Sequence, residues 1–258
     1  MSSMTGAWQV WDQATSYGQT LYRRAVGELP EMESAKKMAR EAGRVFRNGD
    51  SILDVGCGAG HYLPSLRRLI PTPFAYHGID ATENYVELAK KAFAGQPHVE
   101  FSVGSIFDLD LPDRSYDVVM CNNVLLHMPS IARPLSELVR VARHKVLVRF
   151  LCGQRSFIIQ DVHPQADGEE FDSQLRPVGF HYYNIYSQAY VHRLISDLTG
   201  VESWTIAPDT DYDQQKILDS ATEHDGAHDA SGITGGYQVN GYILQPWAVL
   251  EITRTPSQ

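Results

Sequence analysis

The sequence predicts a doubly wound α/β fold, with a mostly parallel sheet and helices on both of its faces. Strand-length apolar segments alternate with helix-length segments from residue 51 to residue 151, which is the pattern of βαβ units. A glycine-rich turn directly follows the first of these strands. The 258 residues are 43% hydrophobic and 21% charged, a composition that suits one large domain with additions. Right-handed crossovers then leave few topologies.

The N-terminal residues 1–48 are expected to form a helical lid. Residues 1–29 are rich in tryptophan and tyrosine and carry no strong period. Apolar residues then recur at helical spacing from Met32 to Phe46, with Pro30 in the expected first turn, where its missing N–H costs nothing. Asn48-Gly49 is a helix stop signal. We therefore expect this segment to pack over the domain that follows.

The alternating region gives five strands and three helices. The expected strands are residues 51–55, 74–79, 99–103, 116–121 and 145–151. The expected helices are residues 61–69, 82–93 and 131–142. Thr82 precedes the second of these helices, so we expect its side chain to cap the helix.

The alternation loosens after residue 151. A helix is expected at residues 188–198, and strands at residues 201–206 and 242–252, the latter interrupted by Pro246. Residues 155–162 suit either a strand or an extended segment. The polar, glycine-rich residues 208–240 are expected to form an irregular surface insertion.

Composition and charge argue against several classes of protein. The formal net charge of −9 disfavours a nucleic-acid partner, because such proteins need a basic surface. No apolar run approaches the roughly 20 residues of a membrane helix, so no membrane segment is expected. Cys57, Cys121 and Cys152 show no C-x-x-C spacing, which favours reduced thiols in the cytoplasm. His224 and His228 stand in a glycine-containing loop, so no metal site is expected.

The most informative motif is the segment 54–60, Asp-Val-Gly-Cys-Gly-Ala-Gly, between the first strand and the next helix. Glycines at this turn allow a sharp bend and the close approach of a ligand. Asp80 ends the second strand, 26 positions after Asp54. A carboxylate at that place can accept hydrogen bonds from both ribose hydroxyls of an adenosine.

Two other nucleotide motifs fit this segment less well. A dinucleotide fingerprint, G-x-G-x-x-G, requires glycine at position 61, which is histidine here. The chain contains no G-x-x-x-x-G-K-[ST], which excludes a P-loop. Asp54 would repel a pyrophosphate but would suit a cationic amino group.

The segment 54–60 resembles the S-adenosylmethionine-binding motif of class I methyltransferases. Residues 102–106 and 116–127 also resemble the family's motifs, so the resemblance covers roughly residues 50–150. It implies a Rossmann-like fold, a methyltransferase activity, and S-adenosyl-L-methionine as cofactor with S-adenosyl-L-homocysteine as product. Many members carry Asp where Ser105 stands. The implied cofactor-binding residues are Asp54, Gly56, Cys57, Gly58, Gly60, Asp80, Ala81, Ser105, Ile106 and Asn122, with Tyr22 and Arg24 from the lid as candidates for the methionine carboxylate.

The resemblance also divides residues 49–258 into a cofactor half, 49–151, and an acceptor-side half, 152–258. An oxygen acceptor would benefit from a general base. His127 follows the fourth strand, at the edge of the sheet where ligands bind in this architecture. His163 and His181 are further candidates from the acceptor-side half. Each of the three histidines also has a purely structural interpretation.

The expected methyl acceptor is a small molecule, such as a saccharide or natural-product hydroxyl or amine. Two alternatives remain open: a protein or RNA methyltransferase, and a cofactor-binding regulatory protein that methylates nothing. A homodimer is also an open expectation, since the sequence does not determine the oligomeric state.

Overall fold

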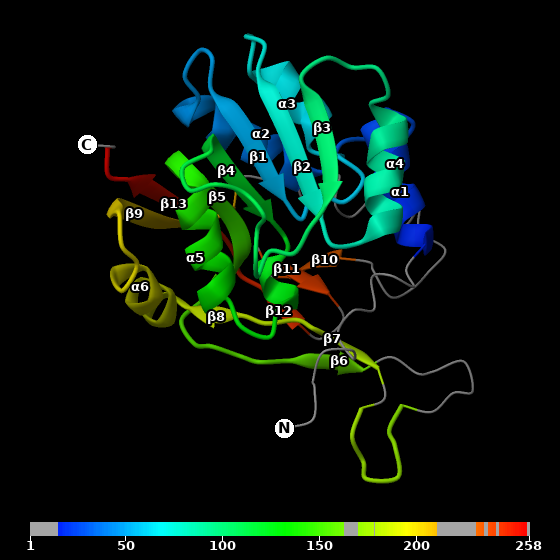
Figure 1. The fold of residues 1–258 in the computed structure, drawn as a ribbon. Helices are drawn as coiled ribbons and strands as arrows, with labels where there is room; N and C mark the ends of the chain where they lie inside the picture. The colour runs from blue at the N-terminus through cyan, green and yellow to red at the C-terminus, as the bar shows by residue number, and fades with distance from the viewer. Residues whose placement is uncertain are drawn as a thin grey trace.

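The structure is a computed structural model that describes residues 15–162, 170–177, 179–210, 231–234, 237–240 and 243–256. Its centre is an eight-stranded sheet in the order β3-β2-β1-β4-β5-β13-β9, with β8 paired to β5 (Figure 1). The strands of this sheet are β1 (Ser51–Val55), β2 (Ala75–Asp80), β3 (Val99–Val103), β4 (Tyr116–Asn122), β5 (Ala142–Gly153), β8 (Tyr186–Ser187), β9 (Val201–Pro208) and β13 (Trp247–Arg254).

Strands β1 to β5 pair in parallel, and β13 pairs antiparallel with both β5 and β9. The strand order reverses between β1 and β4, which places a topological switch point at their carboxyl ends. The prediction of a doubly wound, mostly parallel sheet is confirmed.

Helices cover both faces of the sheet. The helices are α1 (Thr15–Ala25), α2 (Glu33–Val45), α3 (Leu63–Leu69), α4 (Glu83–Ala92), α5 (Ala132–Val141) and α6 (Gln188–Ser196), with a 3₁₀ turn η2 (Leu125–His127). Neighbouring residues on β1 point to opposite faces. Ile52 is fully buried in a core with α2, α3 and α4, and Leu53 in a core with α5 and α6.

Two helix starts differ from expectation. The helix α2 begins at Glu33 with Met32 as N-cap, so Pro30 lies before the helix, where its carbonyl accepts a bond from Arg24. Thr82 does occupy the N-cap of α4, but its side chain makes no capping bond. The Tyr85 N–H, at the N3 position, donates to the Thr82 carbonyl at 3.0 Å, and the Thr82 N–H donates to the Asp80 carboxylate.

The second half contains more strand than the sequence suggested. Short strands β6 (Gln160–Val162) and β7 (Phe180–Tyr182) pair antiparallel. Strands β10 (Ser231–Thr234), β11 (Tyr237–Asn240) and β12 (Ile243–Gln245) form a separate antiparallel sheet. The interpretation of residues 208–240 as wholly irregular is therefore wrong for β10 and β11, where Gly235-Gly236 was an overlooked hairpin signal. Residues 211–230 lie outside the described part.

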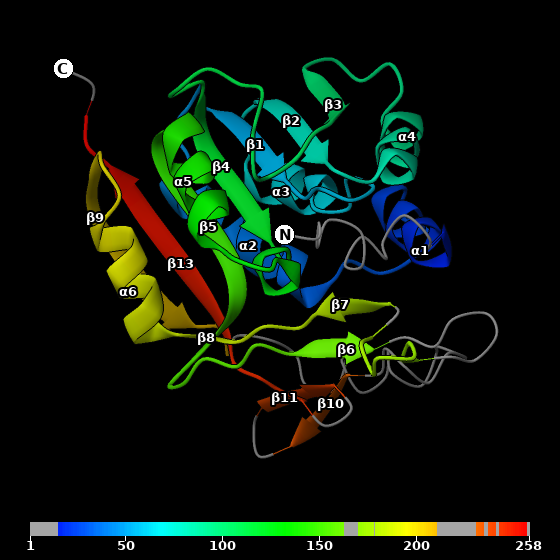
Figure 2. The same ribbon diagram turned by 60° about the horizontal axis from the view of Figure 1, so that its bottom comes forward.

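Several short strands from the second half of the chain lie at the same end of the parallel sheet. The β6–β7 pair and strands β10 and β11 lie beyond the carboxyl ends of the parallel strands, and α1 lies against α4 (Figures 1 and 2). No helix among the described residues is long and apolar enough to cross a membrane. The lid role of residues 1–48 stays a prediction, with residues 1–14 outside the described part.

Candidate functional site

A pocket lies at the carboxyl ends of β1, β2 and β4, with an empty volume of about 1100 Å³ including the part open to solvent. This is where ligands bind in open α/β sheets. Its lining comes from the glycine-rich turn, from the turns after β2, β3 and β4, and from α1 and α4. The lining residues are Tyr17, Leu21, Met32, Val55, Gly56, Gly58, His61, Tyr62, Asp80, Ala81, Thr82, Tyr85, Gly104, Ser105, Ile106, Phe107, Asn122, Asn123, Val124, His127 and Met128.

The glycine-rich turn is shaped by backbone bonds to the neighbouring strand. The N–H groups of Gly56 and Cys57 both donate to the Ile79 carbonyl, at 2.7 and 3.1 Å. Gly56 has φ +79°, and a Cβ there would lie 2.2 Å from a Val124 methyl. Gly58 has φ +54°, and a Cβ there would lie 2.8 Å from Leu21. Any side chain at these two positions would therefore be strained and would push the turn away from the pocket wall.

Asp80 links this turn to the start of α4. Its carboxylate accepts from the Gly58 N–H at 2.8 Å and from the Thr82 N–H at 2.9 Å. These two bonds fix the orientation of the carboxylate at the pocket wall. Ala81 lines the pocket beside it. The carboxylate thus stands where a ligand hydroxyl can reach it, as the proposed ribose contact requires.

Asp54 lies beneath the pocket and does not line it. Its side chain is buried and accepts a hydrogen bond from the Tyr76 hydroxyl at 2.8 Å. Burial raises the pKa of this carboxyl to about 7, against the opposing effect of the Tyr76 bond. Cys57 and Gly60 are likewise absent from the lining, and Gly60 packs against Phe93. Among the described residues, these three support the turn from below.

The two lid residues named from the sequence have partners outside the pocket lining, although the charge of Arg24 adds to burial in lowering the pKa of His61, which lines the pocket. Arg24 donates to the Pro30 carbonyl, and the Tyr22 ring carries the Lys91 ammonium at 5.0 Å. Neither residue lines the pocket, whereas Tyr17 and Leu21 of the same helix do.

Asn122 brings a buried carboxamide to the pocket at the end of β4. The residue is only 5% exposed, and neither its amide nitrogen nor its oxygen has a hydrogen-bond partner in the described part of the chain. His61 Nδ1, also at the pocket, is similarly buried and unpartnered. Buried polar atoms without partners are costly. Both therefore point to a ligand that supplies the missing bonds.

His127 lies at the opposite wall, on the 3₁₀ turn after β4. Its Nδ1 is 2.9 Å from the Tyr182 carbonyl, so that nitrogen carries the proton and donates. The basic lone pair of the neutral ring is then on Nε2. Burial lowers the pKa of His127 to about 4, which keeps the ring neutral at pH 7. A neutral imidazole with a fixed tautomer has the form that a general base needs.

The other two candidate histidines differ in position. His181 lies beside His127, with ring centroids 5.7 Å apart, but outside the pocket lining. Its Nε2 is 3.6 Å from the half-exposed Asp161 carboxylate. His163 falls outside the described residues. The described geometry thus joins His127 and His181 in one cluster.

Two buried polar networks were missed by sequence reasoning. The Arg149 guanidinium donates to Asp209 at 2.6 Å and to the Asn123 amide oxygen at 2.7 Å, and it stacks on Trp247. Asn184 is fully buried; its amide donates to the Met128 carbonyl at 2.9 Å, next to His127. The sequence signal of both networks is a charged or amide residue among apolar neighbours. A single sequence does not distinguish such a buried residue from an exposed one.

The pocket fits an adenosyl cofactor bearing an amino-acid end. Gly56 and Gly58 keep the turn free of side chains, and the Asp80 carboxylate lines the pocket in a fixed orientation. The buried Asn122 carboxamide has no hydrogen-bond partner in the described part of the chain. Ser105 and Ile106 line the pocket on the β3 side, as the resemblance implied. The individual ligand contacts stay proposals.

Comparisons with known proteins agree with this geometry. A family described as "Methyltransferase domain" matches residues 53–150. The demethylmenaquinone methyltransferase of Symbiobacterium thermophilum is 32% identical over 114 residues, which cover 43% of this chain and 45% of that protein. The 2-phytyl-1,4-naphtoquinone methyltransferase of Trichormus variabilis is 32% identical over 98 residues, covering 37% and 43%. The chain thus spans less than half the length of these curated relatives.

Solved structures share the fold at low sequence identity. A structure described as the complex between the Haloferax volcanii Trm112 methyltransferase activator and a putative methyltransferase contains a chain with a TM-score of 0.56 and 18% identity, covering 99% of both chains. The Haemonchus contortus phosphoethanolamine N-methyltransferase 2, in complex with S-adenosyl-L-methionine, gives a TM-score of 0.63 at 13% identity, covering 96% of this chain and 60% of that one. These two likenesses show the fold.

The motif order, the switch-point pocket and the matched domain lead to one conclusion. The expected cofactor class, S-adenosyl-L-methionine, is confirmed with the family. Residues 53–150 are a methyltransferase domain, and the resemblance to the class I S-adenosylmethionine-dependent methyltransferases is confirmed for this part of the chain.

Proposed function

We propose that the protein transfers the methyl group of S-adenosylmethionine to a small-molecule acceptor, a saccharide or natural-product hydroxyl or amine. One observation carries the proposal: a single pocket is lined by the glycine turn and Asp80, at the ends of β1 and β2, and by His127, after β4. Cofactor and acceptor would thus meet in one space, as an in-line displacement requires.

The cofactor wall would bind and orient. Asp80 would accept the ribose hydroxyls, Ala81, Ser105 and Ile106 would flank the nucleoside, and Asn122 would bond the amino-acid end. When bound, the cofactor supplies an electrophilic methyl group on a sulfonium. The chain's own task is then to align the acceptor and to exclude water.

The acceptor wall would supply a base. His127 Nε2 would accept the proton of an acceptor hydroxyl, while the Nδ1–H bond to the Tyr182 carbonyl holds the ring in place. Such a base contributes typically about 10²–10⁴-fold to the rate. Val124 and Met128, which flank His127 in the sequence or lie close to it, add an apolar surface to this side of the pocket. That mixture suits a partly apolar acceptor carrying one reactive hydroxyl or amine.

Calorimetry followed by a transfer assay tests the proposal. The purified protein is titrated with S-adenosylmethionine, S-adenosylhomocysteine and NAD, then incubated with methyl-labelled cofactor and a panel of saccharides, phenols and amines. Binding of the two adenosyl compounds and label transfer to a small molecule would support the proposal. Label on protein or RNA from a cell extract would favour a macromolecular acceptor. Binding without any transfer would favour a regulatory role.

A further inference from the structure

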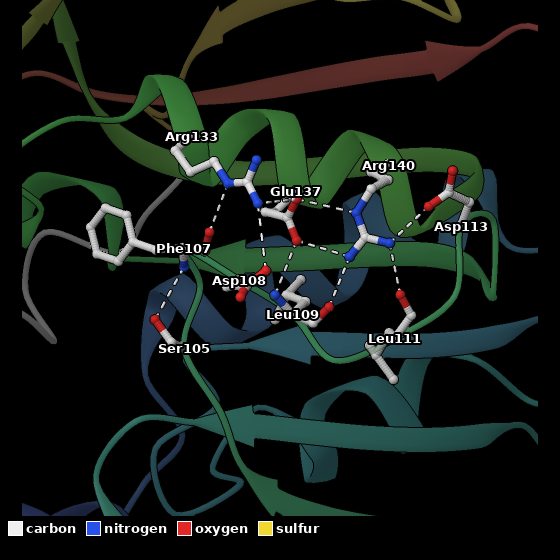
Figure 3. A network of polar contacts seen from close by, with 9 residues as sticks. All are labelled: Ser105, Phe107, Asp108, Leu109, Leu111, Asp113, Arg133, Glu137 and Arg140. Atoms are coloured by element: carbon white, nitrogen blue, oxygen red, sulfur yellow. Dashed lines mark hydrogen bonds and ion pairs between the residues drawn. The ribbon is translucent and has the colours of Figure 1, made fainter.

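Three side chains on α5 hold the segment that follows β3 (Figure 3). Arg133, Glu137 and Arg140 are spaced four and three residues apart, which places them on one face of the helix. The chain from Ser105 to Asp113 runs across that face. The α5 network, as we call these three residues, lies outside the pocket lining.

Glu137 is the centre of this network. Its side chain is only 2% exposed, yet it accepts from the Leu109 N–H at 3.0 Å and from Arg140 at 2.8 Å. The Arg140 bond lowers the pKa of Glu137, so the carboxyl is ionised at neutral pH. A buried carboxylate needs all of its partners, which makes this arrangement hard to replace.

The two arginines bind the backbone of the same segment. Arg140 donates to the Leu109 carbonyl at 2.8 Å and the Leu111 carbonyl at 2.7 Å, and Arg133 donates to the Phe107 carbonyl at 2.8 Å. Three carbonyls of a loop are therefore satisfied by one helix face. The path of residues 107–111 is set by α5.

The near end of this segment forms a pocket wall. Ser105, Ile106 and Phe107 line the pocket. They belong to a turn in which the Asp108 N–H donates to the Ser105 carbonyl at 3.1 Å and the Ser105 hydroxyl accepts from the Phe107 N–H at 3.3 Å. One end of this turn continues β3. At the other end, Arg133 binds the Phe107 carbonyl and Glu137 binds the Leu109 N–H.

We propose that Arg133, Glu137 and Arg140 are positioning residues for the nucleoside end of the adenosyl cofactor. This inference rests on the proposed function. The network orders the wall at residues 105–107 before the ligand binds. The binding free energy is then not reduced by the loss of conformational entropy of that backbone. Without it, the same contacts would form with lower affinity, and the loss would be independent of the amino-acid end.

Calorimetry on three variants tests the inference. The ligands are S-adenosylhomocysteine and methylthioadenosine, which lacks the amino-acid end. Glu137→Gln should weaken both by the same factor, about 10-fold, and the exposed Arg133→Ala by about 2- to 3-fold. Glu251→Gln is the matched control, because Glu251 of β13 also pairs with two cations, Lys145 and Arg44, and its bonds go to these cations and not to the segment 105–113. It should leave both affinities unchanged.

The outcomes separate this inference from the proposed function. Wild-type binding together with unchanged affinity in folded Glu137→Gln overturns the inference alone, even if the melting temperature falls. A loss confined to S-adenosylhomocysteine also overturns it, since the nucleoside end would then be unaffected. If the wild-type protein binds neither ligand, both the proposed function and this inference are overturned. If Glu137→Gln does not fold, Arg133→Ala decides, since its side chain lies at the surface.

Discussion

The two walls of the pocket are built in different ways. The part of the cofactor wall after β1 and β2 consists of short turns, and backbone N–H groups hold it, as where Gly58 donates to Asp80. The acceptor wall depends on contacts between distant parts of the chain, such as Asn184 with Met128 and His127 with Tyr182. Short sequence motifs mark these turns of the first wall, whereas no such motif marks the contacts of the second wall. Substitutions should therefore affect the two walls separately.

The largest expected effect is on the acceptor wall. Replacing His127 with Gln keeps a polar side chain but removes the base, so the rate with an oxygen acceptor should fall by about 10²–10⁴-fold. Steady-state kinetics would measure the loss in kcat. The affinity for S-adenosylhomocysteine should stay the same, because the cofactor wall is untouched. A parallel loss of that affinity would show that the two walls are not independent.

The next effect concerns the buried pair that joins the two halves of the chain. Arg149→Met leaves Asp209 buried without its cation, which costs about 3–5 kcal/mol when a buried pair is broken. Urea unfolding would show the loss as a lower midpoint. The double variant Arg149→Met, Asp209→Leu should recover most of it, since no charge is then left unpaired. Equal stability of the single and double variants would argue against a buried pair.

The cofactor wall gives a smaller effect on binding. Asp80→Ala removes the carboxylate that faces the pocket and should weaken S-adenosylhomocysteine by about 10- to 100-fold, since charge-assisted hydrogen bonds are worth about 1.5–3 kcal/mol. Calorimetry measures the affinity directly. At saturating cofactor, kcat should change far less than in His127→Gln. Unchanged affinity in a folded protein would restrict Asp80 to its two backbone bonds.

The same contrast explains how far the sequence could predict the structure. The strand-turn-helix order and the glycine spacing are local, and the parallel sheet and the position of Asp80 at the end of β2 followed from them. The sequence placed Asp54 at the ligand because an acid precedes the glycines, but it could not tell that this side chain points below the turn toward Tyr76. Alternation along a strand predicts which side chains share a face of the sheet. It does not predict the direction of a side chain where the strand passes into a turn.

The acceptor side was less predictable for a physical reason. His181 and Asn184 reach His127 through pairing of β6 with β7 and through a bond that spans 56 residues, and no local period encodes such contacts. The Arg149–Asp209 pair spans 60 residues in the same way. A buried ion pair is chosen by the packing around it, so each partner alone resembles an ordinary surface charge.

The smallest expected effect is the pH dependence of stability, because buried groups in and beside the pocket contribute with opposite signs. Burial lowers the pKa of His127 to about 4, so its contribution to stability is present above about pH 6.5 and is lost as the pH falls toward 4. His61, with a pKa lowered to about 3, acts in the same direction. Burial raises the pKa of Asp54 to about 7, so its contribution is present at low pH and is lost as the pH rises from about 4 to 7.

Variants separate the two signs. In Asp54→Asn, the fall of stability between about pH 4 and 7 that comes from Asp54 should disappear, and the free energy of unfolding should rise more steeply with pH than in the wild type. In His127→Gln, the rise should be shallower. Urea unfolding at a series of pH values measures both slopes. Identical slopes in all three proteins would mean that folding does not change the pKa of either group. The two side chains would then be more accessible to water in solution than in the structure.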